Sequence, residues 1–275
     1  MNTAIALQHL GRRAALCAAV GEDALGRGLV ARIAAEGVDT RFVRASNTLR
    51  TGLLFAGASS LSKEGEAQFL SYRTPQDEGR QMAKALPERP DARALHLSGL
   101  LPIPAHMRMF RAAFRGAEAS GLFALLDVNA RPRFWNRPDA HALALLSRAY
   151  WVKASRCDLA VIRSSVEELR SRMNENAVLI VTEGASALWA FGPFGSFSCE
   201  VEPILGVDAH RASGAGDVFC AGLLDFVLKH HRGDGTSEVG LASLASISKD
   251  AQLVKGAMER GIEVARAFLM KGREG

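Results

Sequence analysis

The strongest constraint on the fold is an alternation of short apolar runs with helical segments. Apolar runs at residues 94–97, 122–126 and 178–182 have the length and composition of buried strands. Segments with helical spacing of apolar residues lie between them, at residues 105–120 and 166–174. Because strands and helices that alternate in this way form βαβ units, the pattern predicts an α/β fold with a parallel sheet covered by helices on both faces.

The remaining elements follow from the same spacing and from the positions of turn residues. Further helices are expected at residues 2–10, 23–36 and 139–147, and from residue 237 to about residue 270. Further strands are expected at residues 14–20, 51–58, 68–72, 149–152, 188–191 and 195–200. No internal repeat or low-complexity linker interrupts the pattern, so we expect a single domain over residues 1–275.

Composition and charge exclude several classes of protein. The chain has 275 residues, of which 48% are hydrophobic and 23% are charged, as in ordinary globular domains. Its net charge of +5 comes from scattered basic residues, so no nucleic-acid partner is expected. No apolar run approaches the length of a membrane span, so no membrane partner is expected either. A solvated basic surface and an anionic small-molecule ligand are both compatible with this charge.

The four cysteines form neither a metal-binding pattern nor a disulfide framework. Cys17, Cys157, Cys199 and Cys220 include no CxxC pair, and the first and last of them lie in apolar runs. We therefore interpret them as buried free thiols of a reducing compartment, which predicts a cytoplasmic location.

Polar residues gather directly after the expected strands. In open α/β sheets, ligands bind beyond the carboxyl ends of the strands. The residues in such positions are Ser98, Asp127, Asn129, Arg131, Lys153 to Asp158, Thr182 and Gly184. This shared placement predicts an active site at one edge of the sheet, whereas His96 and Trp135 are interpreted as core residues.

The stretch Gly214-Ala215-Gly216-Asp217 carries the clearest chemistry, because an apolar helix follows it at once. Glycine adopts backbone angles that are barred to other residues and lets a ligand approach the backbone closely. A helix that begins near Asp217 would point its first N–H groups into the loop and form an anion site suited to a phosphoryl group. Asp217 could then accept a proton from a substrate hydroxyl. The alternative is that Asp217 only caps the helix.

Competing motifs do not fit this stretch. A dinucleotide-binding fingerprint would need glycine at the position of Phe219, and the GK[ST] sequence of a P-loop occurs nowhere in the chain. A nucleophile elbow centred on Ser213 would need glycine at the position of Arg211. These three classes of site are therefore excluded here.

Six ordered stretches resemble signatures of the ribokinase-like (pfkB) carbohydrate kinases. SGAGDVFCAG, at residues 213–222, resembles the second family signature, and NTAIALQHLG, at residues 2–11, resembles its first signature helix. The others are VGEDALGRGLVARIAAEGVDT (20–40), DVNARPRFW (127–135), KASRCD (153–158) and VTEGASA (181–187). DVNARPRFW is similar to the pattern of the fructokinase and 2-keto-3-deoxygluconate kinase branch. The resemblance implies a ribokinase-like three-layer sandwich with a central, mostly parallel sheet.

The resemblance also implies an activity and a role for particular residues. It implies ATP- and Mg²⁺-dependent phosphorylation of a sugar or sugar-acid hydroxyl, with fructose or 2-keto-3-deoxygluconate as substrate. Asp217 would be the general base, Gly214, Ala215 and Gly216 would offer backbone N–H groups to the phosphate, and Asp158 would help to place Mg²⁺ through water. The nucleotide would be bound by Thr182, Gly184, Ser155 and Lys153, and the substrate by Asn2, Arg73, Asn129 and Arg131.

Several of these residues have a purely structural alternative. Asp158 can be an acid in the first turn of a helix, where the helix dipole stabilises it. Thr182 and Gly184 can be strand-end and turn residues, and Arg131 can be a surface residue. Asp23 is interpreted as a turn or cap residue and is assigned no role in the site.

Two departures from the family pattern keep a second class of function open. Arg211-Ala212 stand where the family usually has Asp-Thr, which reverses the local charge. The chain begins at the Asn of the first signature, so the preceding strand and much of the lid are expected to be missing, with residues 51–72 as remnant lid strands. The alternatives are a catalytically silent descendant that binds nucleotide or sugar, and a nucleoside kinase. Because the family's lid often forms a dimer contact, a homodimer is a further expectation.

Overall fold

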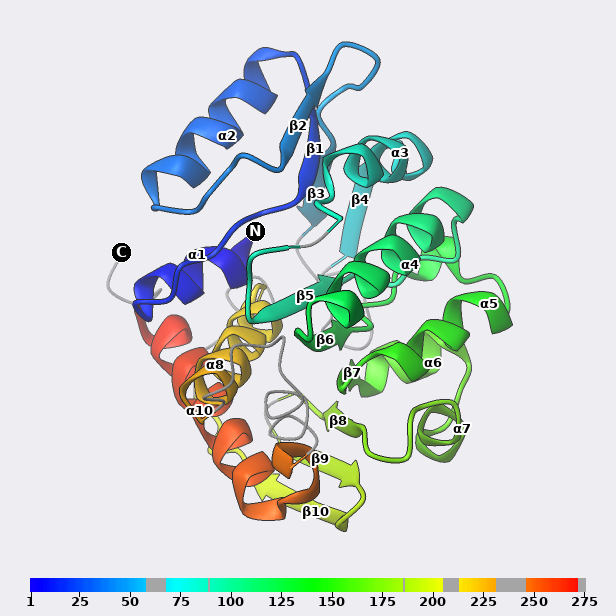
Figure 1. Ribbon diagram of the computed structural model, residues 1–275, viewed down its shortest axis with the longest axis vertical. Coiled ribbons are helices and arrows are strands. Elements are labelled where there is room, and N and C mark those ends of the chain that lie inside the picture. The colour runs from blue at the N-terminus through cyan, green and yellow to red at the C-terminus, as the bar shows by residue number, and fades with distance from the viewer. Residues whose placement is uncertain (58–67, 89, 185, 205–212, 231–245, 272–275) are drawn as a thin grey trace. The chain divides into compact units, whose positions relative to one another are not determined.

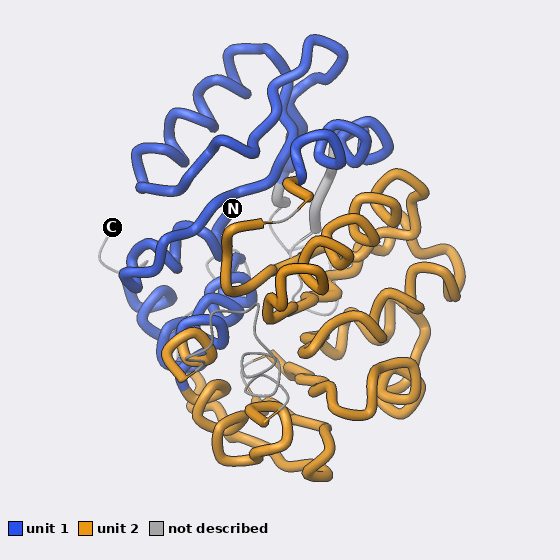
Figure 2. The backbone as a smooth tube through the Cα atoms, viewed as in Figure 1, with its two compact units in different colours: residues 1–86, 204–225, 260–275 blue, residues 87–203, 226–259 orange. Residues whose placement is uncertain are grey.

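In the computed structural model, the described residues are 1–57, 68–88, 90–184, 186–204, 213–230 and 246–271, and they divide into two units (Figure 2). Unit 1 comprises residues 1–86, 204–225 and 260–275, and unit 2 comprises residues 87–203 and 226–259. Two long helices, α8 (Ala215–His230) and α10 (Ala251–Lys271), contribute residues to both units. The expectation of a single domain over residues 1–275 stays a prediction.

Unit 2 is built on a six-stranded sheet, which Figure 1 shows from β5 to β10. Its strands are β5 (Ala94–Ser98), β6 (Phe123–Asp127), β7 (Trp151–Ser155), β8 (Val178–Thr182), β9 (Ala187–Gly192) and β10 (Gly195–Glu200). They lie in the order β10-β9-β8-β7-β6-β5. Strands β5 to β8 are parallel, and β9 and β10 extend the sheet as an antiparallel hairpin. The predicted α/β class with a mostly parallel sheet is confirmed.

Helical segments pack on both faces of this sheet. The helices of unit 2 are α4 (Pro104–Ala119), α5 (Ala140–Leu143), α6 (Arg156–Ile162) and α7 (Val166–Ser171). On one face, Tyr150 lines a pocket together with Phe114 and Ala117 of α4. On the opposite face, the indole N–H of the next residue, Trp151, donates to Ser248 Oγ at 3.0 Å. Every residue of β6 is buried, as expected for a strand covered on both sides.

Unit 1 contains smaller sheets and the first helix. Its elements are α1 (Asn2–His9), β1 (Ala18–Gly21), α2 (Ala24–Ala35), β2 (Val43–Ser46), β3 (Leu53–Gly57), β4 (Gln68–Tyr72) and α3 (Pro75–Ala85). Strands β1 and β2 form a parallel pair, and β3 and β4 form an antiparallel pair. Ala4, Ile33 and Val38 form a small core between α1 and α2.

The sequence pattern missed three elements and shifted others. Helix α3 begins with proline and is mostly polar, so it contains too few apolar residues to be recognised by their spacing. Helix α6 has only seven residues, and β2 only four. The strand expected at 14–20 starts at Ala18, after an isolated bridge at Ala15. The helix expected at 139–147 divides into α5 and a 3-10 turn, and the first residues of the one expected from 237 lie outside the described chain.

None of the four cysteines, all of which lie in the described residues, forms a disulfide, and not all of them are buried. Cys199 and Cys220 are buried and Cys17 is half-buried, whereas Cys157 is exposed in the first turn of α6. Burial raises the pKa of the Cys17 thiol to about 11, so this side chain stays protonated at neutral pH. The expectation of buried thiols is therefore wrong for Cys157, because the second position of α6 lies on the solvent side of that helix. Within the described residues, no helix is both long and apolar enough to cross a membrane.

Candidate functional site

The first group of predicted site residues lies in unit 1, where α8 begins. Gly214 precedes the helix with a φ of +92°, and its carbonyl accepts the first helical hydrogen bond, from Val218 N at 3.0 Å. A Cβ atom on Gly214 would lie 3.1 Å from Asn2 Nδ2, so glycine meets both a backbone and a space requirement. Asp217 then occupies the third helical position, as the sequence predicted for a helix start.

Helix α1 holds the start of α8 through its own first residues. Asn2 Nδ2 donates to Asp217 Oδ2 at 2.9 Å, and Thr3 Oγ1 donates to the carbonyl oxygen of Asp217 at 3.1 Å. Asn2 was predicted to bind substrate, and in the structure its amide orients the predicted base. Thr3 is buried and was not singled out from the sequence, since a threonine in a helix carries no distinctive signal.

The other end of α1 is also attached to α8. Arg12 Nε donates to Asp225 Oδ1 at 2.7 Å, and Arg260 Nε from α10 donates to Asp225 Oδ2 at 3.0 Å. Asp225 is two turns along α8 from Asp217 and is nearly buried. Helix α1 is therefore fixed to α8 at two points, and this limits the freedom of the Asp217 backbone.

Arg73, a predicted substrate residue, lies at the end of β4 in unit 1. Its guanidinium forms an ion pair with Glu78 of α3, whose side chain is only 6% exposed. The aliphatic part of Arg73 lies over Gly52, where a Cβ atom would come within 2.7 Å of Arg73 Cγ. The ion pair fixes the direction of Arg73, while 44% of its side chain stays exposed to a ligand.

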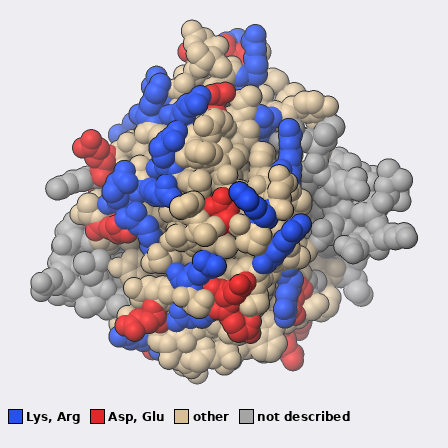
Figure 3. All heavy atoms as spheres, turned by 90° about the vertical axis from the view of Figure 1, so that its right-hand side faces the viewer, with Lys and Arg blue, Asp and Glu red and all other residues tan. Residues whose placement is uncertain are grey.

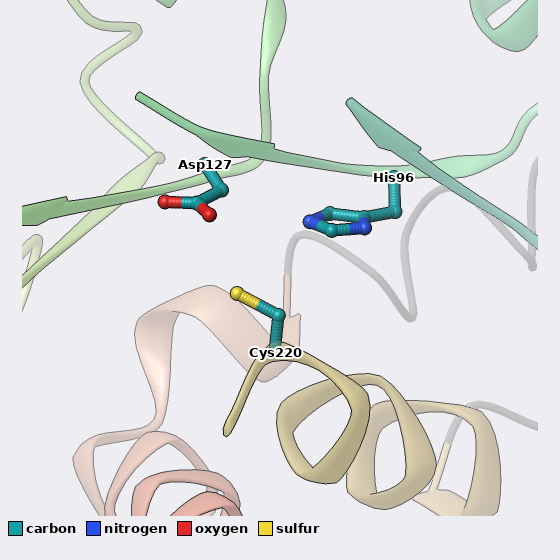
Figure 4. A group of neighbouring side chains, drawn as sticks. All are labelled: His96, Asp127 and Cys220. Carbon is teal, nitrogen blue, oxygen red and sulfur yellow. The ribbon is translucent and has the colours of Figure 1, made fainter. Parts of the chain in front are cut away.

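The second group lies in unit 2, at the carboxyl ends of the parallel strands. Ser98, Asp127 and Lys153 are cross-strand partners on β5, β6 and β7, so they share one face of the sheet. Lys153 Nζ lies 3.0 Å from Asp127 Oδ1, and both side chains are buried. Figure 4 shows His96 and Asp127 on the same face of neighbouring strands, and it also labels Cys220, which belongs to α8 in unit 1. Lys153, predicted for the nucleotide, is thus held by a buried carboxylate.

Asn129 and Arg131 follow β6 directly. Asn129 has a φ of +39°, and its Nδ2 donates to Ser98 Oγ at 3.0 Å. Arg131 is exposed at the start of the 3-10 turn Pro132–Phe134. Trp135, which ends that turn, is 3% exposed and donates to Leu100 O at 3.1 Å, so its interpretation as a core residue is confirmed.

Ser155 and Asp158 form a capping box at the start of α6. Ser155 Oγ accepts from Asp158 N, and Asp158 Oδ2 accepts from the amide and the hydroxyl of Ser155 at 2.7 and 2.8 Å. Asp158 Oδ1 accepts from Ala130 N at 2.6 Å. A carboxylate offers about four lone-pair positions, and three are used here. The remaining capacity fits a water molecule of a hydrated Mg²⁺ rather than direct coordination by both oxygens.

Thr182 and Gly184 lie at the end of β8. Thr182 is the cross-strand partner of Ser155, which places both hydroxyl side chains on the same face as Lys153. Gly184 has a φ of +61° in the turn toward β9, and a Cβ atom there would meet no atom of the described residues within 4 Å, its chain neighbours left aside. The backbone angle alone explains glycine at this position, and the open space leaves room for a ligand.

Ser98 and Asp127 belong to this group although no role was assigned to them from the sequence. Their only signal was their place after apolar runs, and the cross-strand register is what joins them to Lys153. Arg211 and Ala212, the departure from the family loop, lie outside the described residues. Figure 3 shows Lys and Arg spread over one face with Asp and Glu among them, in agreement with the scattered charge in the sequence.

Comparison with known proteins gives a consistent result. The model of the pfkB family of carbohydrate kinases matches residues 1–250. A fructokinase from Klebsiella pneumoniae is 28% identical over 274 residues, which cover 94% of this chain and 85% of that enzyme.

Solved structures show the same fold. A fructokinase from Vibrio cholerae in its apo form has a TM-score of 0.74 at 20% identity, over 100% of this chain and 89% of that one. A double mutant of the Vibrio cholerae enzyme with fructose, ADP and potassium ion bound has a TM-score of 0.70 at 21% identity, over 98% of this chain and 88% of that one.

Proposed function

The chain belongs to the pfkB family of carbohydrate kinases, and we propose that it transfers the γ-phosphoryl group of ATP to a hydroxyl of fructose. As a member of this family it is a sugar kinase, a phosphotransferase with an alcohol group as acceptor. Fructose is preferred because several relatives are fructokinases, such as that of Klebsiella pneumoniae at 28% identity, and a solved fructokinase of the same fold holds fructose and ADP. An aminoimidazole riboside kinase at 27% identity is the reason to test a riboside as well. A sugar acid such as 2-keto-3-deoxygluconate is the second acceptor to test.

The observation that carries the proposal is the environment of Asp217. Its carboxylate lies in the first turn of α8, and among the described residues one side chain, Asn2, donates to it. No described residue donates to Oδ1, and this oxygen is the proposed acceptor of the proton of a substrate hydroxyl. Asp217 accepts the hydroxyl proton as the oxygen attacks the phosphorus atom, while Asn2 holds the carboxylate in place.

The backbone before Asp217 supports the transfer. The first N–H groups of a helix have no acceptor within the helix. Those of Ala215 and Gly216 would donate to oxygens of the transferring phosphoryl group, and the helix dipole adds a partial positive charge. Gly214 allows the chain to turn into the helix without a side chain over these groups.

The residues of unit 2 are proposed to act on the nucleotide and the metal ion. Thr182 and Gly184 would contact the nucleotide, with Ser155 and Lys153 on the neighbouring strand. Asp158 would hold Mg²⁺ through a water molecule, in the manner that its remaining lone pair permits. When bound, Mg²⁺ neutralises charge on the phosphate oxygens. Arg131 would contact the phosphate.

The test is ADP formation by the purified chain with ATP and a panel of acceptors. The panel contains fructose, 2-keto-3-deoxygluconate and a riboside. Fructose-dependent ADP formation that disappears in Asp217→Asn supports the proposal. Turnover with the riboside alone would replace it by a nucleoside kinase. ATP binding without turnover on any acceptor would contradict it and favour the catalytically silent descendant.

A homodimer and a cytoplasmic location complete the proposal. Strands β3 and β4 form a two-stranded ribbon whose Leu54, Phe55 and Tyr72 are 56%, 55% and 61% exposed. A two-stranded ribbon is marginally stable alone, so a second copy that covers these side chains would stabilise it. Light scattering of the wild type and of Phe55→Ser tests this, and a wild-type monomer at all concentrations would contradict it.

A further inference from the structure

Asn129 has an unusual backbone conformation for which no secondary structure accounts. Among the described residues, only Asn129 and Arg163 have a positive φ without being glycine, at +39° and +52°. Arg163 ends α6 as a left-handed cap, which is a common helix ending. Asn129 instead lies just beyond β6, at the carboxyl edge of the sheet. Such conformations persist where surrounding contacts impose them, often at functional sites.

A chain of polar contacts holds Asn129 from three strands. Asn129 Nδ2 donates to Ser98 Oγ at 3.0 Å, and Ser98 Oγ donates to Asp127 Oδ2 at 3.2 Å. Asp127 Oδ1 pairs with Lys153 Nζ at 3.0 Å. Asp127 is 1% exposed, whereas Ser98 is exposed and Asn129 is half-buried. The contacts therefore run from a buried charge pair to the accessible edge of the sheet.

The numbers of hydrogen-bond donors and acceptors in these groups determine the orientation of the Asn129 amide. An ionised carboxylate only accepts hydrogen bonds, so the one hydroxyl hydrogen of Ser98 is directed to Asp127. Ser98 Oγ can then only accept from Asn129, and only the nitrogen of an amide donates. Nδ2 must face Ser98, and Oδ1 is left on the other side of the amide. Assignment of an amide from its hydrogen-bond network is the usual way to decide its orientation.

We infer that Asn129 Oδ1 accepts a hydrogen bond from a hydroxyl of a ligand, and that Ser98 and Asp127 are positioning residues for this acceptor. Within the described part of the chain, no group donates to Asn129 Oδ1. An ionised phosphate oxygen cannot donate, whereas the donors that accompany the transferring phosphoryl group, on the acceptor sugar and on the ribose, are hydroxyls, so we assign the ligand group facing Oδ1 to a hydroxyl. The inference rests on the proposed function, which supplies two sources of hydroxyl: the acceptor sugar and the ribose of ATP.

Asn129 and Arg131 are then expected to contact different groups of the ligands. Asn129 and Arg131 were both expected to face the phosphate or the sugar. With its carbonyl outward, Asn129 recognises a hydroxyl, and the cationic Arg131 is the one suited to an anion. The consequence is that Asn129 contributes to discrimination between ligands with and without one hydroxyl, and little to phosphate binding.

The test measures this discrimination with deoxy analogues. KM is determined for fructose and single-position deoxyfructoses at saturating ATP, and for ATP, 2′-deoxy-ATP and 3′-deoxy-ATP at saturating fructose. When the hydroxyl that faces Asn129 is missing, the KM of the wild type should rise by about fivefold relative to the parent compound, the factor for one neutral hydrogen bond. The sugar and nucleotide arms distinguish the two sources of the hydroxyl.

Variants of Asn129 and Ser98 then remove the acceptor or its support. Asn129→Gly, which tolerates the positive φ, should abolish the preference at that position and leave the others unchanged. Ser98→Ala should reduce it, and Ser98→Thr, which keeps the hydroxyl, should restore it. Ser196→Ala on β10 is the matched control, because Ser196 is likewise an exposed strand serine. Purely structural damage would raise KM for all analogues equally and leave the ratio at one position intact.

Two results would overturn the inference. One is an unchanged preference at every sugar and nucleotide position in both Asn129→Gly and Ser98→Ala. The other is that Asn129→Gly weakens competition by inorganic phosphate while sparing hydroxyl discrimination. If the wild type turns over no acceptor, the proposed function fails separately. In that case the dissociation constants of the same analogues are measured by equilibrium binding. We expect the same preference for the parent compound in the wild type and the same loss of preference in the variants.

Discussion

Helices α6 and α8 both carry aspartate at their third position, and the two carboxylates are hydrogen-bonded in different ways. In α6 the preceding cap residue is Ser155, and Asp158 closes a capping box with it. In α8 the corresponding residue is Gly214, which has no side chain to close such a box. The Asp158 carboxylate accepts three hydrogen bonds, whereas the Asp217 carboxylate accepts one among the described residues, from Asn2.

The difference shows how one residue at the cap decides the role of an acid three positions later. A serine cap directs the carboxylate back to the backbone and stabilises the helix start. A glycine cap leaves the carboxylate available, and a residue from another helix then orients it. The same helix position can therefore hold a structural acid or a candidate general base.

The largest effect on activity is expected for the Asp217 carboxylate. Asp217→Asn should lower kcat by about 10³-fold, because general-base catalysis contributes factors of this size, while the free energy of unfolding changes little. Steady-state kinetics and urea unfolding measure the two quantities. Turnover close to that of the wild type would show that Asp217 is not the base.

A large effect on stability is expected for the Asp158 carboxylate, which accepts three hydrogen bonds. Asp158→Ala should lower the free energy of unfolding by about 2–3 kcal/mol, because the carboxylate half of the capping box is lost and the buried amide of Ala130 loses its acceptor. Urea unfolding measures this. Glu168→Ala in α7 is the matched control, since Ser165 and Glu168 form the same box at an exposed site, with an expected loss of about 1 kcal/mol. Equal losses would mean that burial of the Asp158 box adds nothing.

A smaller effect is expected when the α8 cap is made like that of α6. Gly214→Ser and Gly214→Ala both place a Cβ atom on a residue with a φ of +92°, so they share the same strain. Only the serine hydroxyl can donate a hydrogen bond to the Asp217 carboxylate and so compete with the substrate hydroxyl. We expect kcat of Gly214→Ser to be about tenfold below that of Gly214→Ala, the factor for one hydrogen bond to a charged group. Equal kcat values would show that the residue at the cap position does not determine whether the Asp217 carboxylate is available to the substrate.

The smallest effect concerns a third aspartate, Asp23, which is itself the cap of α2. The hydroxyl of Thr51 donates to Asp23 and, with the amides of Thr51 and Gly26, lowers the pKa of the carboxyl to about 2. Since the folded pKa lies below the unfolded value, the stabilisation is complete above about pH 4 and is lost as the pH falls toward 2. The wild type should therefore exceed Asp23→Asn in stability at pH 6, and the difference should shrink below pH 4.

Urea unfolding at several pH values from 6 to 3 checks this prediction. Thr51→Ala serves as the comparison, because it removes the hydroxyl donor and should leave a weaker pH dependence of the same sign. A difference between wild type and Asp23→Asn that grows as the pH falls would contradict the assigned sign.

The sequence by itself determined the α/β class and the location of most strands. Strands β4, β8 and β10 lie at the predicted residues, because their apolar composition and flanking turns are local properties. Gly37 and Gly121 end their helices with positive φ, as glycine after a helix predicts. The ordered signatures determined the family in the same way, since each is a short stretch. The polar helix α3 was missed because it has few apolar residues, and α6 was missed because its seven residues are too short to show a helical period.

Only the tertiary structure decided what each polar residue does. The sequence placed Asp158 and Asp217 equally well at helix starts, but contacts from Ala130 and Asn2, distant in the chain, separate their roles. Cross-strand register joined Ser98 to Asp127 and thereby set the amide of Asn129. Hydrogen bonds depend on which atoms meet across elements, and neither residue type nor local spacing contains that information.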